Sequence, residues 1–381
     1  MIFVCAVLFL AICPAPVGVL ARIIGVIGWI GVVSLMIAIL PEPPQVDGRQ
    51  YFANYTAFSA SELVNILINQ FDPSHSFVYS LAVLPLVLKP LLGAFVSLGP
   101  WSIILPYGII WMLSSFAWVK AVSMKRESPF FADPLFTSLL FVLLMTLPSV
   151  AYWSMSFMKE IPLVAFSVFS AIQFSRSKCI SGIIFLLIAT LLRPYAPGIV
   201  IGLFLFLQSS NKLRCVGFFG AIATLLIYSK GTLLTIAKVF LTLVYMFLSP
   251  NPLNASNWLL VTVSIRGTSM PTLFMNIEGI FLGLLFVIGL VILLLGRRRN
   301  CLFTVGLSLL FGSVILILVD CYYILTIFSS YSLFTFGAPL VRLKFSFWPL
   351  IATWSALTIT AIVRKVMSLF HNSPHQGHEM Q

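Results

Sequence analysis

Apolar residues are grouped along this chain in long runs, and short polar breaks separate one run from the next. A helix needs about 20 predominantly apolar residues to cross a bilayer, and the run Gly279–Leu295 is uninterrupted over most of that length. Strands of a membrane barrel would instead alternate apolar and polar residues. The pattern therefore predicts an all-α, polytopic integral membrane protein with about 10–11 transmembrane helices.

The first two apolar runs are Ile2–Leu20 and Ile23–Leu40. We interpret both as retained helices, because the first lacks the positively charged start of a signal peptide. The later crossings are predicted at residues 101–119, 133–148, 161–175, 182–192, 196–208, 215–228, 279–296, 301–319 and 347–363. One further run, Val78–Ser97, contains two prolines and Lys89, and is predicted to be an external re-entrant or interfacial helix.

Lysine and arginine residues indicate which breaks face the cytoplasm. The densest clusters are Lys120/Lys125/Arg126, Arg176/Lys178, Lys212/Arg214, Arg297/Arg298/Arg299 and Arg364/Lys365. We place these inside, and Pro41–Phe77, Ser149–Glu160, Ser229–Glu278 and Asp320–Phe345 outside. The chain is then one transmembrane domain over residues 1–365, with external loops at 41–100, 229–278 and 320–346. Residues 366–381 are predicted to be a disordered cytoplasmic tail.

The composition supports a membrane protein, since 60% of the 381 residues are hydrophobic and only 8% are charged. Soluble domains carry roughly a quarter charged residues. The net charge of +12 does not indicate nucleic-acid binding, because no basic cluster belongs to a soluble domain. The six cysteines are scattered and have no histidines at ligand spacing, so we expect no metal site and no cofactor.

The predicted topology leaves 9 of the 22 cations outside, together with 7 of the 10 carboxylates. Nine external cations are more than the positive-inside rule accounts for. An anionic partner on the external side is the interpretation we follow.

The first external loop contains Asp47, Arg49 and Tyr51. A carboxylate just beyond a membrane-exit helix can act as a general base when an acceptor hydroxyl lies within hydrogen-bond reach. Asp47 is therefore the catalytic candidate, and Arg49 and Tyr51 are substrate-binding candidates. The alternative is a solvated turn, for which Asp47-Gly48 is a common dipeptide.

A second candidate segment, containing Lys159 and Glu160, lies where an external loop returns to the membrane. Glu160 falls at a predicted helix start, where the helix dipole favours an anion. Capping alone could account for it. Lys159 is a candidate for binding either a substrate phosphate or lipid headgroups.

Arg193, followed by Pro194 and Tyr195, interrupts two short apolar arms. An ionisable residue at membrane depth is a functional candidate by default, and arginine binds phosphate in bidentate fashion. The alternative is a structural ion pair with Asp320 or Glu160. Tyr195 is a further substrate-binding candidate.

Arg342 and Lys344 stand just before the last predicted crossing, on the external side. Cations that snorkel to the interface are common there, but these two oppose the positive-inside preference. Both are candidates for phosphate binding. Arg266, in the 229–278 loop, is a weaker candidate of the same kind.

The order of these parts resembles the bacterial membrane glycosyltransferases of the GT-C superfamily and the related O-antigen and exopolysaccharide polymerases. The likeness lies in short motifs spread over most of the chain: Asp47 with Tyr51, Pro148-Ser149 with Trp153-Ser154 and Lys159-Glu160, Arg193-Pro194-Tyr195, Phe247–Pro252, and Phe336–Phe345 with Pro349. Glu42 and Asp47 are not the adjacent acidic pair that such enzymes often carry, and this departure argues against metal binding.

The resemblance implies an enzyme of the bacterial cytoplasmic membrane whose active site faces outward. It would transfer a sugar or oligosaccharide from a polyprenyl-phosphate- or polyprenyl-diphosphate-linked donor to an acceptor glycan, alongside other polysaccharide-assembly proteins. By position, Asp47 would activate the acceptor, and Arg193, Arg342 and Lys344 would hold the lipid phosphate.

Two other classes remain open. A transporter or flippase for an anionic or lipid-linked substrate would also use broken helices and an intramembrane arginine. The chain shows no convincing duplication between its halves, which favours the enzyme. A non-catalytic membrane scaffold would leave the external cations unexplained.

Overall fold

The computed structural model describes residues 17–40, 48–69, 82–86, 89, 101, 103–125, 128–156, 158–208, 211–228, 233–250, 252–253, 255–259, 263–265, 268–295, 299–323 and 343–371. Regular structure over these residues is helical, apart from one antiparallel hairpin of β1 (Val263–Ile265) and β2 (Thr268–Met270). The all-α prediction is confirmed.

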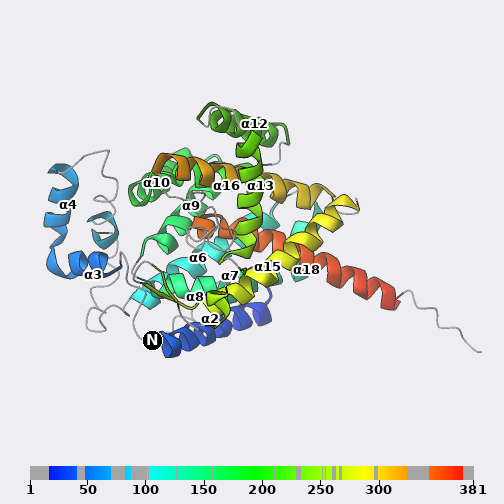
Figure 1. Ribbon diagram of the computed structural model, residues 1–381, viewed down its shortest axis with the longest axis horizontal. Coiled ribbons are helices and arrows are strands. Elements are labelled where there is room, and N and C mark those ends of the chain that lie inside the picture. The colour runs from blue at the N-terminus through cyan, green and yellow to red at the C-terminus, as the bar shows by residue number, and fades with distance from the viewer. Residues whose placement is uncertain are drawn as a thin grey trace, which may run out of the picture.

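The helices form a single bundle from which α3 and α4 project on one side (Figure 1). In chain order they are α2 (Val19–Ile39), α3 (Gly48–Ala57), α4 (Ala60–Asn69), α6 (Ile104–Ser123), η3 (Pro129–Ala132), α7 (Pro134–Thr146), α8 (Pro148–Met155), α9 (Glu160–Ser175), α10 (Cys179–Leu192), α11 (Ala196–Leu207), α12 (Asn211–Tyr228), α13 (Leu233–Leu248), α14 (Ser256–Leu259), α15 (Thr272–Leu294), α16 (Arg299–Tyr323), η4 (Lys344–Phe347) and α18 (Trp348–His371).

Among the described residues, five helical segments are long and apolar enough to cross a membrane. They are Val19–Ile39, Ile104–Ser123, Thr272–Leu294, Asn300–Leu318 and Lys344–Leu369. The pair α7 and α8, bent by 46° at Leu147, makes a sixth if it counts as one span. Fewer spans meet the length criterion than the 10–11 expected, because α9, α10 and α11 have only 16, 14 and 12 residues.

Prolines and capping side chains set several helix boundaries. Asp133 accepts a hydrogen bond from the Leu135 amide at 2.9 Å and Pro134 occupies the first turn, so α7 begins there. Pro194 disfavours helical backbone in the residue before it, and Arg193 is accordingly extended, with φ −151° and ψ 124°. The predicted break between the 182–192 and 196–208 arms is therefore confirmed.

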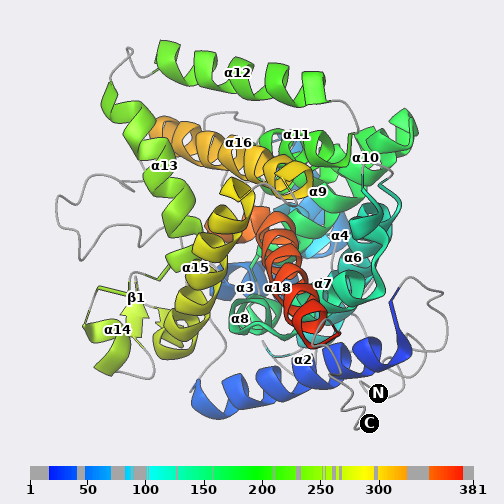
Figure 2. The ribbon, with the colours of Figure 1, turned by 90° about the vertical axis from the view of Figure 1, so that its right-hand side faces the viewer.

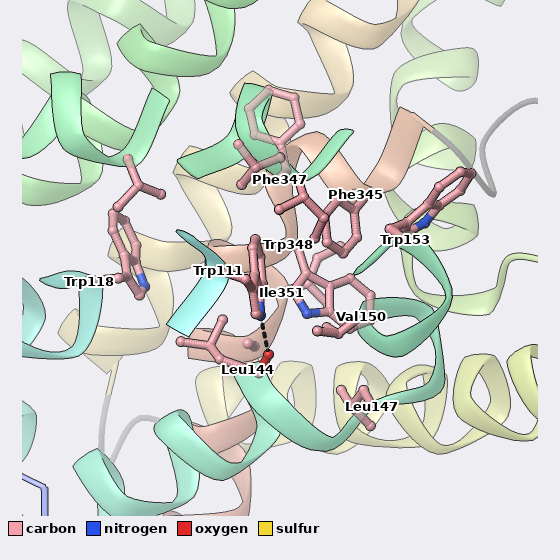
Figure 3. Packing of buried hydrophobic residues seen from close by; sticks show 14 of the residues in the cluster. Trp111, Trp118, Leu144, Leu147, Val150, Trp153, Phe345, Phe347, Trp348 and Ile351 are labelled. Carbon is pink, nitrogen blue, oxygen red and sulfur yellow. Dashed lines mark hydrogen bonds between the residues drawn. The ribbon is translucent and has the colours of Figure 1, made fainter. Parts of the chain in front are cut away.

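Helix α18 lies at the centre of the bundle, between α7 on one side and α15 and α16 on the other (Figure 2). Its tryptophans Trp348 and Trp354 are fully buried. Phe345, just before α18, packs on Trp111 and Trp348 with ring centroids 5.1 and 5.7 Å apart, and Trp111 donates a 2.7 Å hydrogen bond to the Leu144 carbonyl (Figure 3). An aromatic core thus joins α6, α7 and α18.

The polar breaks fall into two groups at opposite ends of the bundle. At one end, the α3 end, contacts join Tyr51 to Lys159, Ser149 to Glu278 and Glu278 to Lys344. At the other end, which we call the Arg364 end, contacts join Arg364 to Asp133, Lys125 to Phe206 and Arg214 to Thr304. These contacts join breaks that the charge pattern assigned to the same side.

Several predicted boundaries are wrong. Arg22 does not separate two helices: α2 continues through it from Val19, and the Arg22 Nε atom donates to the Val17 carbonyl at 2.9 Å. The expected 229–278 loop contains α13, and α15 begins at Thr272, six residues before Glu278. Helix α18 continues to His371, so residues 366–371 are helical and not part of a tail.

Other predictions fall outside the described residues. Ile2–Leu20 is described only from residue 17, and Val78–Ser97 only at 82–86, which is helical, and at Lys89. Within the predicted first loop, residues Ala60–Asn69 are described and form α4. Ser59 and Glu62 make a capping box at its start, since the Ser59 amide donates to the Glu62 carboxylate at 2.6 Å and the Glu62 amide donates to the Ser59 hydroxyl at 3.3 Å.

Close packing of α2 on α7 predicts that Gly25→Ala destabilises the protein while Gly31→Ala does not. A Cβ at Gly25 would lie 2.7 Å from the Phe141 ring, which is fully buried, whereas a Cβ at Gly31 meets nothing within 4 Å. Overpacking costs about 1–3 kcal/mol, so the Gly25 variant should unfold at a lower temperature in detergent micelles. Equal melting temperatures for the two variants would contradict this packing.

Candidate functional site

The α3 end of the bundle contains several of the residues that the sequence singles out. We call Tyr51, Lys159, Glu160, Arg193 and Tyr195 the α9 cluster, because they surround the N-terminus of α9. Tyr51 comes from α3, Lys159 and Glu160 from the start of α9, and Arg193 and Tyr195 from the break between α10 and α11. Packing of α9 on α10 and α11 brings the second and third of these segments together, and the contact of Tyr51 with Lys159 adds α3.

An ion pair between Glu160 and Arg193 lies at the centre of this cluster. The Glu160 Oε1 atom is 3.6 Å from the Arg193 Nη2 atom. Glu160 is the first residue of α9, where the helix dipole also stabilises a carboxylate. The pair with Glu160, one of the two structural partners expected for Arg193, is therefore present.

Aromatic rings flank both cations of the cluster. The Lys159 Nζ atom lies 5.7 Å from the Tyr51 ring centroid, and the Arg193 Cζ atom lies 5.9 Å from that of Tyr195. Both distances are near the outer limit of about 6 Å for a cation–π contact. Tyr51 is fully buried, so α3 is held against the start of α9 through this contact.

Exposure differs sharply among the charged members. Lys159 is 1% exposed, and the Glu160 side chain is 5% exposed. The Arg193 side chain is 22% exposed, and its Nε atom is buried without a hydrogen-bond partner among the described residues. Two cations and one carboxylate leave a net positive charge within the cluster, and its most exposed charged member is an arginine, a residue type suited to binding phosphate.

A second polar group, which we call the Glu278 cluster, lies deeper in the protein and consists of Ser149, Ser249, Glu278 and Lys344. The Glu278 carboxylate accepts hydrogen bonds from the Ser149 amide at 2.7 Å and the Ser149 hydroxyl at 2.6 Å. Its Oε1 atom is also 3.5 Å from the Lys344 Nζ atom, which donates to the Ser249 carbonyl. Both charged side chains are fully buried.

The Glu278 cluster connects four segments that are far apart in the sequence. Ser149 lies in the first turn of α8, whose amides have no partner within the helix, so the Glu278 carboxylate caps α8 from α15. Lys344 opens η4 just before α18, and Ser249 follows α13 directly. The structure thus places Lys344 in an internal ion pair and not in the α9 cluster.

The remaining predicted site residues are only partly placed. Arg49 lies in the first turn of α3, two residues before Tyr51. Asp47, Arg266 and Arg342 fall outside the described residues. Among the residues that the structure describes, no group of three or more His, Cys, Asp or Glu side chains could hold a metal ion.

Sequence reasoning missed Glu278 as a structural residue. The signal was present, because Glu278 is a carboxylate inside the apolar run that forms α15, and such residues are rare and almost always paired. It was assigned to the end of a loop because the run was expected to begin at residue 279.

Comparison with protein-family models, with curated proteins and with solved structures found no match to this chain.

The buried ion pair predicts that Glu278→Gln destabilises the protein strongly and that Lys344→Met in the same chain restores part of the loss. Removing one partner of a buried pair leaves an unpaired charge and costs about 3–5 kcal/mol, whereas removing both leaves no charge to desolvate. Thermal unfolding of the two single variants and the double variant in detergent measures this. Additive losses in the double variant would show that the two side chains do not depend on each other.

Proposed function

We propose that this protein is a membrane glycosyltransferase or polysaccharide polymerase. It transfers a sugar or oligosaccharide from a polyprenyl-phosphate- or polyprenyl-diphosphate-linked donor to an acceptor glycan, at the outer face of a bacterial cytoplasmic membrane. The observation that carries the proposal is the α9 cluster. Lys159, the residue before Glu160, and Arg193, which pairs with the Glu160 carboxylate, are two cations from separate segments at the same end of the bundle.

A lipid-linked phosphate suits this cluster for two reasons. The donor's phosphate lies at the level of the headgroups while its chain stays in the hydrocarbon, and Arg193 lies between two apolar helices at their shared end. The Arg193 side chain is partly exposed, its buried Nε atom has no hydrogen-bond partner within the described part of the chain, and an arginine can form two parallel hydrogen bonds to phosphate oxygens. Lys159 and the N-terminus of α9 add positive potential nearby.

In the proposed reaction, the acceptor hydroxyl oxygen attacks the anomeric carbon of the donor sugar. The bond between that carbon and the phosphate oxygen breaks, and the lipid phosphate leaves with the electron pair. Cations held in place before the reaction stabilise the negative charge that develops on the leaving group. A carboxylate takes the proton of the acceptor hydroxyl.

Asp47 is the carboxylate that the resemblance assigns to this role. It is four residues before Tyr51 in the sequence, so its Cα atom lies within about 14 Å of the Tyr51 Cα atom whatever the backbone conformation. Tyr51 itself contacts Lys159. Chain connectivity to Tyr51 is therefore the support for assigning this role to Asp47.

A transporter or flippase for a lipid-linked or anionic substrate is the second candidate. The broken pair α10 and α11, with Arg193 at the break, is a feature that favours it. The two functions differ in what the substrate becomes, because a transporter moves it unchanged and a transferase separates the sugar from the lipid.

Arg193→Ala and Asp47→Asn are each expected to abolish glycan extension while the protein still inserts in the membrane. The measurement is the amount of lipid-linked donor consumed and glycan formed by purified protein in liposomes. Arg364→Ala is the matched control, since it removes an arginine from an ion pair of 3.0 Å with Asp133 at the opposite end of the bundle, and it should retain activity. Full activity of both site variants would refute the assignment, and translocation without transfer would favour the flippase.

The two ends of the bundle are expected to face opposite sides of the membrane. Single cysteines introduced at Tyr195 and at Ser368, in a chain without its native cysteines, should react with a membrane-impermeant thiol reagent from opposite sides. The position 195 cysteine should react in intact cells, and the position 368 cysteine only after the membrane is opened. Labelling of both from the same side would remove the basis for an outward-facing site.

A further inference from the structure

The short turn between α8 and α9 determines where two charged members of the α9 cluster lie. Met155 ends α8, and Glu160 begins α9, so the turn includes Ser156, Met158 and Lys159. Within it the Met158 amide donates to the Ser156 carbonyl at 2.7 Å, and the Ser156 hydroxyl donates to the Trp153 carbonyl at 3.0 Å. These bonds shape the turn, but they do not fix it against the other helices.

Tyr107 supplies a bond to this turn from a different helix. It lies in the first turn of α6, is fully buried, and its hydroxyl donates a 2.6 Å hydrogen bond to the Met158 carbonyl. The accepting carbonyl belongs to the residue directly before Lys159. The same hydroxyl is close enough to the Glu160 carboxylate and the Tyr51 phenol for electrostatic interaction.

The hydrogen bond from Tyr107 acts at a point of the chain that determines where Lys159 and Glu160 lie. Movement of the Met158 carbonyl would shift Lys159 and Glu160 together, because these are the next two residues of the chain. Arg193 reaches the cluster on another segment and would not follow that movement. The distance between Glu160 and Arg193 therefore depends on how firmly α6 holds the turn.

We propose that Tyr107 is a positioning residue of the α9 cluster: its hydrogen bond to the Met158 carbonyl keeps Lys159 and Glu160 in place opposite Arg193, so that an anionic lipid phosphate meets a preformed site. The proposal rests on the proposed function. It assigns Tyr107 no contact with the substrate.

Tyr107→Phe tests the proposal, because it removes the hydroxyl and keeps the buried ring. Loss of one buried hydrogen bond at the site should lower kcat/KM for the lipid-linked donor about ten-fold, mainly through a higher KM. The matched control is Ser170→Ala, which removes a buried 2.8 Å hydrogen bond from α9 to the Gly182 carbonyl. That bond lies away from the cluster, so the control should change kcat/KM less than two-fold.

A double-variant comparison separates positioning from general stability. Arg193→Lys keeps the charge but loses the planar fork, so correct placement of the turn matters less. In that background, Tyr107→Phe should lower kcat/KM less than two-fold. Equal effects of Tyr107→Phe and Ser170→Ala, or an undiminished ten-fold loss in the Arg193→Lys background, would overturn the proposal.

Thermal unfolding is a second test of the role of Tyr107, and it does not require the protein to catalyse the proposed reaction. The melting temperature of the Tyr107→Phe/Arg193→Lys double variant should fall by less than the sum of the two single falls, because both act on one arrangement. Absence of any transfer by the native protein would reject the proposed function alone. Additive melting shifts would reject the role of Tyr107 whether or not transfer occurs.

Discussion

The fold depends on the requirement that a carboxylate inside a membrane-spanning helix must find partners within the protein. Glu278 lies in α15, and it accepts two hydrogen bonds from Ser149 and pairs with Lys344. Lys344 in turn holds the carbonyl that follows α13. Because each partner is on a different segment, satisfying one buried charge fixes α8, α13, α15 and the start of α18 together. The aromatic core around Phe345 then packs in the space that this arrangement defines.

The α9 cluster depends on that arrangement through α8. Glu278 holds the first turn of α8, and the turn that carries Lys159 follows the last residue of the same short helix. Tyr107 holds the far side of that turn from α6. The partly buried Glu160–Arg193 pair is thus supported by a fully buried one. The two differ in exposure, because both side chains of the Glu278 pair are enclosed by protein, whereas the Arg193 side chain is 22% exposed.

Many of the helix positions could be predicted from the sequence, because long apolar runs and prolines determine local backbone structure. The spans at 161–175, 182–192 and 196–208 correspond to α9, α10 and α11 within a few residues, and the grouping of the breaks into two ends agrees with the observed contacts. The sequence placed all members of the α9 cluster on the external side of the membrane, but it did not show that they contact one another. The pairing of Lys344 with Glu278 and the bond from Tyr107 could not be predicted, since each joins residues whose separation in the sequence says nothing of their distance. Helix α13 was not predicted, because polar residues on both sides of its apolar run led us to include the run in the 229–278 loop.

The short helices on one flank have a consequence for the bilayer around the protein. At 1.5 Å per residue, α10, which has most of the exposed apolar side chains on this flank, extends only about 21 Å, less than the roughly 30 Å of an average hydrocarbon layer. In a bilayer, lipids next to this flank would compress to avoid exposing their chains to water, as hydrophobic mismatch requires. Such local thinning would draw the headgroup region inward toward Arg193. Under the proposed function, a lipid-linked donor would then travel less far to present its polar end, and the protein would recruit it partly by deforming the membrane around it.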